Sequence, residues 1–250
     1  TPLMLGATPI AAFNAAPLLA GLNATDCDRI MVLIRLKGGN DGLNTVIQRG
    51  NNEYYNIGSL QSFISYTRTT FPNCGEEVSV GNNYPTVEVP YEDGFYIPAR
   101  TPFELTAIAS DEDGDALTYC WEQRDNEITA STLGEPMGNA PIMRSRPPTT
   151  DPTRLFPNRT FILANISSSS EILPTYDRDM TFFCTVRDNA PEGGGTVWDG
   201  LSFKVDGESG PFRLSFPSNT NDELTAGENV EFIWDPANSQ NAPVNCKAVD

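Results

Sequence analysis

From Thr86 onward the sequence is built from short runs in which apolar and polar residues alternate, separated by Gly, Pro, Asn and Asp. Successive side chains of a β-strand point to opposite faces, so each run predicts a strand with one buried face. Runs with the 3.6-residue period of an amphipathic helix are nearly absent, which favours an all-β fold. The apolar positions expected to share the buried faces are Phe103, Leu105, Ala107 and Ala109, then Leu117, Tyr119 and Trp121, then Phe182, Cys184 and Val186, then Leu201, Phe203 and Val205.

The order of these runs predicts a β-sandwich over residues 86–207. A strand, an acidic turn, a strand that carries Trp121, a long connection, a strand that ends in Arg-Asp-Asn and a final strand follow one another. This order resembles immunoglobulin-like modules of the cadherin and PKD type. We also expect an extended apolar arm with one lone strand at residues 1–56, a short helix and linker at 57–85, and a partial second β-sandwich at 208–250.

One amphipathic helix is expected in the middle of the chain, at the start of the segment 57–75. Leu60, Phe63 and Ile64 have the i, i+3, i+4 spacing of an apolar helix face, and Ser59 is a candidate N-cap. Pro and Gly at the end of the segment lead into a linker.

The charge of the chain limits its partners. The 16 basic and 33 acidic residues leave a net charge of −17, which repels nucleic acid and anionic membrane surfaces and suits a secreted protein at the cell surface. Residues 1–22 carry no charge, but three prolines and two glycines interrupt them, so we expect no membrane-spanning helix there. This segment is interpreted as a docking arm or as the end of a processed leader.

Histidine is absent from the whole sequence. Its absence excludes Ser-His-Asp and Cys-His catalysis, zinc sites with histidine ligands and the His-Glu-x-x-His helix of metalloproteases. Chemistry would have to rest on carboxylates alone, and no pair of carboxylates stands out as a glycosidase centre. We therefore expect that the chain is not an enzyme.

The cysteines are widely spaced and form no Cys-x-x-Cys pair, which fits an oxidising compartment better than a zinc site. If Trp121 points into the core, the side chain of Cys120 points outward, whereas Cys184 shares the inward face with Phe182. A disulfide between Cys120 and Cys184 is therefore not expected. Cys184 is interpreted as a small buried apolar residue, and Cys120 could instead reach Cys74.

The loop between two of the expected strands carries three alternating carboxylates, Asp111, Asp113 and Asp115, with Gly114 among them. This spacing can wrap a cation that takes oxygen ligands, and bound calcium would relieve the repulsion between the carboxylates. Asp and Gly also favour a plain polar turn. Both interpretations stay open at this point, and Asp188 could approach the same end of the sandwich.

A connection at residues 134–179 is long and rich in Pro and Ser. It is interpreted either as a solvated loop that tucks in two phenylalanines, Phe156 and Phe161, or as a binding loop. Its first part gathers the arginines Arg144, Arg146, Arg154 and Arg159.

Several segments in the same order resemble the region that follows the catalytic domain of secreted bacterial zinc metalloproteases of the reprolysin-like type. They are IGSLQSFI, DEDGDALTYCWEQ, GNAPIMRSRPPTT, EILPTYDRDMTFFCTVRDN, GPFRLSFP and APVNC. The resemblance covers about residues 57–250. It implies accessory modules of a cell-surface protein without the protease itself.

A second resemblance concerns roughly residues 1–50. The segment VLIRLKGGNDGLNTVI is similar to the opening of a family of secreted bacterial proteins related to alkaline phosphatases and sulfatases. This resemblance implies that Asp41 is a metal ligand. An isolated aspartate cannot hold a catalytic metal, so a lone strand followed by a tight Gly turn is the competing interpretation.

Three functional hypotheses follow. The first is a non-catalytic extracellular β-sandwich module that positions, attaches or binds, with a protein or a cell-surface glycan as partner. The second is a structural subunit of a surface fibre or adhesin, in which the N-terminal arm completes a neighbouring sandwich by strand addition. A metal-dependent phosphoesterase that uses Asp41 is a third and weaker hypothesis.

Overall fold

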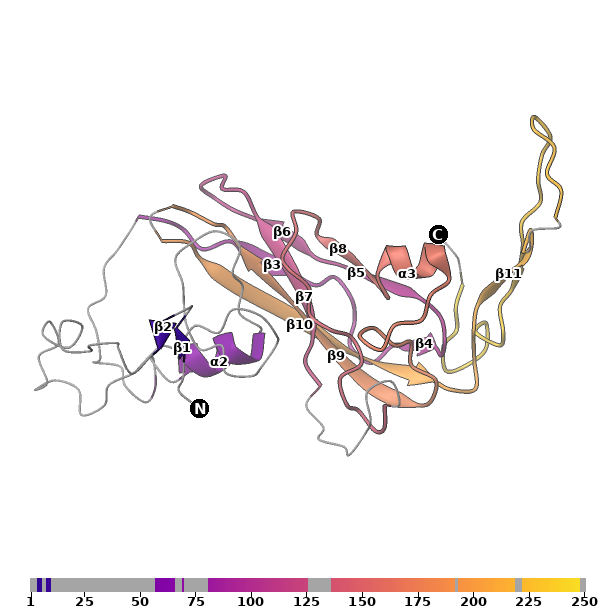
Figure 1. Cartoon of the computed structure of the whole chain (residues 1–250), viewed down its shortest axis with the longest axis horizontal. Helices are drawn as coiled ribbons and strands as arrows, with labels where there is room; N and C mark the ends of the chain where they lie inside the picture. Colours follow the sequence, from indigo (N-terminus) through magenta and orange to yellow (C-terminus); the bar gives the residue numbers. More distant parts are fainter. Residues whose placement is uncertain are drawn as a thin grey trace, which may run out of the picture.

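The computed structural model describes residues 4–5, 8–9, 57–65, 69, 81–125, 136–191, 193–218 and 222–247. Most of the predicted arm, its lone strand, Asp41 and Cys74 lie outside these residues. The described part is mainly β, which confirms the all-β expectation (Figure 1). Its elements are β1 (Met4–Leu5), β2 (Thr8–Pro9), α2 (Ile57–Ser65), β3 (Thr86–Glu88), β4 (Tyr96–Pro98), β5 (Phe103–Thr106), β6 (Ile108–Ser110), β7 (Thr118–Gln123), β8 (Thr153–Phe156), α3 (Arg159–Ala164), β9 (Arg178–Arg187), β10 (Thr196–Asp206), β11 (Arg213–Phe216) and β12 (Ile233–Asp235).

The largest sheet has the strand order β4-β10-β9-β7. Strands β9 and β10 are the longest, with 10 and 11 residues, and they pair antiparallel along almost their whole length. Strand β7 pairs antiparallel with the other edge of β9, while β4 pairs parallel with β10. The long β9–β10 pair runs diagonally through the middle of the molecule (Figure 1).

Two short antiparallel pairs complete the central part, β5 with β8 and β3 with β6. Strands β5 and β6 are consecutive pieces of one extended segment that changes partner at Ala107. Strands β3 and β4 are likewise divided, since β3 pairs with β6 whereas β4 pairs with β10. The chain therefore crosses from one sheet to another between Glu88 and Tyr96.

A cluster of aromatic rings fills the space between the β5–β8 pair and the largest sheet. Phe103 and Phe156 stack with ring centroids 5.1 Å apart, and both meet Phe182 of β9 edge-on, at 5.8 and 4.8 Å. Phe182 in turn stacks on Phe203 of β10 at 5.7 Å. The inward faces predicted from the sequence alternation are confirmed, since the core also contains Leu105, Ala107, Trp121, Cys184, Val186, Leu201 and Val205.

The connection at residues 134–179 is more ordered than a solvated loop. It supplies β8, which pairs with β5, and the two-turn helix α3. Phe156 is completely buried in the core, and Phe161 of α3 is half-buried beneath the guanidinium of Arg146. The interpretation as a solvated loop was wrong for these two elements, because β8 has only four residues and lies among prolines and arginines, whereas the burial of Phe156 was predicted correctly.

The outward face of β7 is buried as well, which the sequence alternation did not predict. Cys120 is 2% exposed and Glu122 is 1% exposed, although both point away from the side of Trp121. The Cys120 thiol donates to the carbonyl of Arg146, at 3.4 Å, and Glu122 accepts hydrogen bonds from the N–H of Ile57 and the hydroxyl of Ser145, each at 2.7 Å. Segments before and after β7 therefore cover this face.

Helix α2 is found where it was predicted, with Ile57 and Leu60 buried. Its first residue is Ile57, so Ser59 lies inside the first turn and the prediction of Ser59 as N-cap was wrong. The backbone N–H of Ile57 is bound by the Glu122 carboxylate instead, and this side chain is 65 residues away in sequence.

The last described segment forms the antiparallel pair β11–β12, as the apolar runs at both sides of the turn predicted. Phe212 stacks on Trp234 with centroids 5.2 Å apart. Side chains of β12 remain exposed, with Ile233 and Trp234 49% and 47% accessible to solvent. Neither described helix is long or apolar enough to cross a lipid bilayer.

Candidate cation site

The carboxylates of Asp111, Asp113 and Asp115 come together in the loop that joins β6 to β7. One oxygen from each lies within 4.8 Å of the others. The backbone closes around Asp111, whose Oδ1 accepts hydrogen bonds from the N–H groups of Asp113 and Asp115, both at 3.0 Å. Gly114 has φ of +79°, which other residues rarely adopt, so glycine is required there for the turn. The loop is therefore a turn, as one of the two interpretations predicted.

The second oxygen of Asp111 has no hydrogen-bond partner among the described residues, although this atom is buried. An unpaired buried carboxylate oxygen is costly, since a charged oxygen loses water and gains nothing in exchange. A cation bound between the three carboxylates would supply the missing interaction. This oxygen is the feature that distinguishes the loop from an ordinary acidic turn.

Asp113 is held by a segment far away in sequence. Its Oδ2 accepts the N–H of Asn83 at 2.6 Å, and its Oδ1 accepts the side-chain amide of the same residue at 3.0 Å. Two hydrogen bonds from one residue fix the plane of the Asp113 carboxylate before any ligand binds. Asn83 was not predicted as part of the site, because no local pattern in the sequence relates it to the loop.

The local negative charge changes the acidity of Asp115. Partial desolvation raises the pKa of its carboxyl group, and the nearby carboxylates of Asp111, Asp188 and Asp113 raise the pKa further. The same charges that favour the protonated form of Asp115 would favour a bound divalent cation. Protons and a cation are therefore expected to compete for this side chain.

Asp188 follows β9 and lies close enough to the acidic loop for its charge to act on Asp115, as predicted. It is 1% exposed, and its oxygens already accept hydrogen bonds from Gly195, Asn82 and Ala190. A Cβ atom on Gly195 would lie 2.7 Å from Asp188, so this close approach requires glycine. Asp188 adds charge near the loop, while its hydrogen bonds tie the β9–β10 turn to the segment before β3.

The donor set fits calcium better than a transition metal. Carboxylate oxygens are the ligands of hard cations, and calcium accepts the irregular geometry and the additional water ligands that a partly exposed loop provides. Histidine is absent from the chain, and the exposed position of Asp113 leaves one side of the cluster open to water. The arrangement suits a cation that crosslinks a loop.

Two of the four arginines singled out in the sequence share a buried partner. Arg146 and Arg154 both form ion pairs with the completely buried carboxylate of Glu171, which also accepts the N–H of Asn158. The Arg154 guanidinium lies 4.4 Å from the centre of the Phe156 ring. These arginines hold the connection of residues 134–179 together.

Cys120 and Cys184 are both unpaired and buried, so the expectation of no disulfide between them is confirmed. Burial raises the pKa of the Cys184 thiol to about 12, and it raises that of Cys120 as well. Both side chains are therefore protonated at neutral pH and act as apolar residues rather than as nucleophiles. The predicted reach of Cys120 to Cys74 involves a residue outside the described part.

No family model, curated protein or solved structure matches the chain. The two family resemblances drawn from sequence motifs therefore stay predictions.

Proposed function

We propose that the chain is a non-catalytic accessory module of a secreted, metalloprotease-like protein at the cell surface, where it positions, attaches or binds. Its fold type is proposed to be an immunoglobulin/cadherin-like sandwich. The distribution of strands supports this type, since β3, β5–β6 and β8 belong to one side and β7, β9 and β10 to the other. This division corresponds to strands A, B and E against C, F and G of an immunoglobulin constant domain, and the buried Trp121 lies on the strand that corresponds to C.

Calcium is the proposed cofactor of this module, with Asp111, Asp113 and Asp115 as ligands. The unpaired buried oxygen of Asp111 carries the proposal. A cation there would connect the β6–β7 loop to the segment that contains Asn83 and would stiffen one end of the sandwich. Such a stiff spacer suits a module that holds other domains at a distance from a cell surface.

A calcium titration of the whole chain tests the cation site. At about 100 times the dissociation constant, a ligand that binds only the folded state adds about 2.7 kcal/mol to the free energy of unfolding. For a chain of this size that corresponds to a rise in Tm of roughly 5 to 10 °C. Calorimetric titration and thermal unfolding, with and without a chelator, measure the affinity and the shift.

The variant Asp111→Asn sharpens this test. The asparagine oxygen can still accept the two backbone N–H groups, while an amide nitrogen replaces the unpaired ligand oxygen. We expect calcium affinity to fall on the order of tenfold or more, since a charged ligand is lost. Glu112→Gln is the matched control, because it removes one charge from an exposed side chain of the same loop. Equal calcium shifts in both variants, or no shift in the wild type, would refute the site.

The non-catalytic part of the proposal has its own test. The purified chain should hydrolyse neither protein nor phosphate and sulfate esters, with calcium, magnesium or zinc added. Support for this expectation comes from the sequence without histidine. Turnover that persists through purification and disappears in a point variant would contradict the proposal.

A fibre or adhesin subunit is the second candidate, and the exposed strand β12 favours it. Ile233 and Trp234 of β12 are 49% and 47% exposed, and Phe232 directly before the strand is 56% exposed, on a sheet that has two strands in the described part of the chain. A strand from a neighbouring molecule could extend this sheet. Removal of residues 1–36 should abolish assembly if the arm is the donor strand, and should leave a monomer if the chain is an accessory module.

A further inference from the structure

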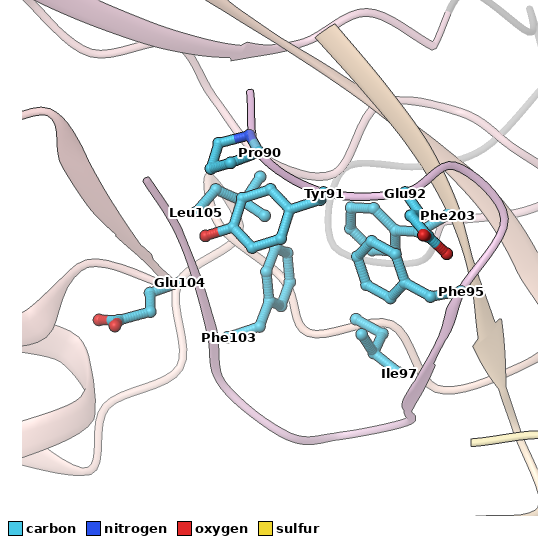
Figure 2. Close-up of a pocket in the computed structure, with 9 residues that line it drawn as sticks. All are labelled: Pro90, Tyr91, Glu92, Phe95, Ile97, Phe103, Glu104, Leu105 and Phe203. Carbon is cyan, nitrogen blue, oxygen red and sulfur yellow. The ribbon is translucent and has the colours of Figure 1, made fainter. Parts of the chain in front are cut away.

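A pocket of about 310 Å³ opens between β4 and β5. Most of its lining comes from the continuous segment of residues 90–105, which bends around it, and Phe203 of β10 adds a ring from the neighbouring sheet (Figure 2). The pocket exists because the chain crosses between sheets here. Strand β4 pairs with β10, whereas β5 pairs with β8. It lies outside the acidic loop and shares no residue with it.

Aromatic rings dominate this pocket. Phe95 stacks on Phe203 with centroids 5.0 Å apart and an interplanar angle of 14°, while Phe103 meets Phe203 edge-on at 5.5 Å. Phe203 is 1% exposed and belongs to the core, whereas Phe95 and Phe103 are only half-buried. The partly accessible rings therefore rest on a buried ring of the core.

Tyr91 adds a fourth ring and is fixed in place. Its hydroxyl oxygen accepts the backbone N–H of Thr106 at 3.0 Å, which ties the segment before β4 to β5 across the pocket. The ring lies above Phe103 and beside Phe95, with centroids 6.3 Å apart from the latter (Figure 2). Ring faces and edges from two strands and one loop thus surround a single space.

The charge at this pocket is negative. The carboxylate of Glu92 lies beside the rings of Phe95 and Phe203, while that of Glu104 points away from them (Figure 2). Among the described residues that line the pocket there is no lysine or arginine. The chain as a whole carries a charge of −17, so an anionic ligand would be repelled and a basic partner attracted.

We propose that this pocket binds a lysine or arginine side chain of a partner protein. Cations are attracted to the faces of aromatic rings, and long basic side chains pack their carbon stems against apolar surface while the charged group reaches a carboxylate. The volume lies at the lower end of ligand pockets, which fits one long side chain. The inference adds the chemistry of a partner to the proposed accessory module and does not depend on the cation site.

Binding of capped pentapeptides to the full-length chain tests this inference. Each peptide carries alanine at four positions and lysine, arginine, norleucine or glutamate at the centre. Norleucine has the carbon stem of lysine without its charge. We expect saturable shifts of aromatic resonances with the lysine and arginine peptides, weaker binding of norleucine and none of glutamate. The shifts should be the same with calcium and with a chelator.

Two variants test the residues involved. Glu92→Gln removes the carboxylate without changing its shape, and Phe95→Leu removes a ring. Each should weaken binding of the lysine peptide about two- to fivefold, the range for one exposed charge pair or one cation–π contact. Glu228→Gln, an exposed charge in the segment before β12, is the matched control and should bind like the wild type.

Three results would overturn the inference. One is equal binding of the norleucine and lysine peptides, which would make the pocket purely apolar. Another is failure of both basic peptides to bind, with thermal unfolding showing an intact fold. The third is preferential binding of a methyl glycoside, tested in parallel, which would make the pocket a sugar site.

Discussion

Two buried acids show how single side chains link distant segments. Glu122 connects β7 to the start of α2 and to Ser145, and Glu171 connects two arginines to the residue before α3. Both side chains are almost fully buried. Neither was predicted to be buried, because glutamate is usually exposed and a single sequence does not show the partners that compensate a buried charge.

Glu122 should make stability depend on pH. Desolvation raises the pKa of this carboxyl group above its ordinary value of 4.5, although hydrogen bonds from Ser145 and Ile57 and the nearby Arg187 and Arg154 partly offset the effect. The folded state therefore holds the proton more tightly than the unfolded state. The contribution of Glu122 to the free energy of unfolding is fully present below pH 4.5 and is lost as the pH rises through the higher pKa of the folded state.

The variant Glu122→Gln does not titrate at this position. Urea unfolding between about pH 4 and about pH 7.5 should therefore show the variant gaining stability relative to the wild type as the pH rises. The sign of this difference is the prediction. If the stability of the variant relative to the wild type stayed constant across the range, or fell with rising pH, burial would not raise the pKa of Glu122.

At the element scale, the core depends on a strand that lies in the least regular part of the sequence. Strand β8 has four residues, and Phe156 at its end stacks on Phe103 and contacts Phe182 edge-on. Two-residue alternation needs a longer run to be recognised. Of the two strands in this sheet, β5 was therefore predicted and β8 was not. In the same connection, α3 has no buried residue and contributes little to the core.

Substitution of Phe156 tests this view of the connection. Phe156→Ala should lower the free energy of unfolding by about 3 to 5 kcal/mol, because it opens a cavity among rigid rings. Leu163→Ala in α3 is the control, since Leu163 is 75% exposed and the expected change is within about 0.5 kcal/mol. Chemical denaturation measures both. Similar effects of the two variants would mean that β8 does not belong to the core.

At the scale of the whole molecule, the charge of −17 is a source of self-repulsion. Part of it is concentrated at one end, where the acidic loop and Asp188 meet. Salt screens all of these charges, whereas calcium would bind at one place. The two effects can be separated experimentally, because calcium binding requires Asp111 whereas screening by salt does not.

Sodium chloride should raise the Tm of the wild type and of Asp111→Asn alike. An increase in ionic strength from about 0.01 M to about 0.15 M shortens the Debye length from about 30 Å to about 8 Å and weakens the repulsion. Calcium at constant ionic strength should raise the Tm of the wild type far more than that of the variant. If sodium chloride lowered the Tm of both proteins, favourable ion pairs rather than repulsion would dominate.

Much of the fold follows from the sequence, because strand periodicity is local. The inward positions of Phe182, Cys184 and Val186 on β9 were predicted correctly, since two-residue alternation is a property of the strand itself. The acidic cluster was also predictable, because five consecutive residues with a glycine have no way to lie far apart. Local sequence patterns are therefore enough to fix which strand faces are apolar and where the carboxylates gather.

Which distant segments meet depends on the packing of the folded chain. It brought Asn83 to Asp113, covered Cys120 and Glu122, inserted β8 beside β5, and left an aromatic pocket between β4 and β5. These features depend on contacts between residues far apart along the chain, and their energies are realised only when the sheets pack. A local pattern specifies what a side chain can do, while the packed fold determines the partner with which it does so.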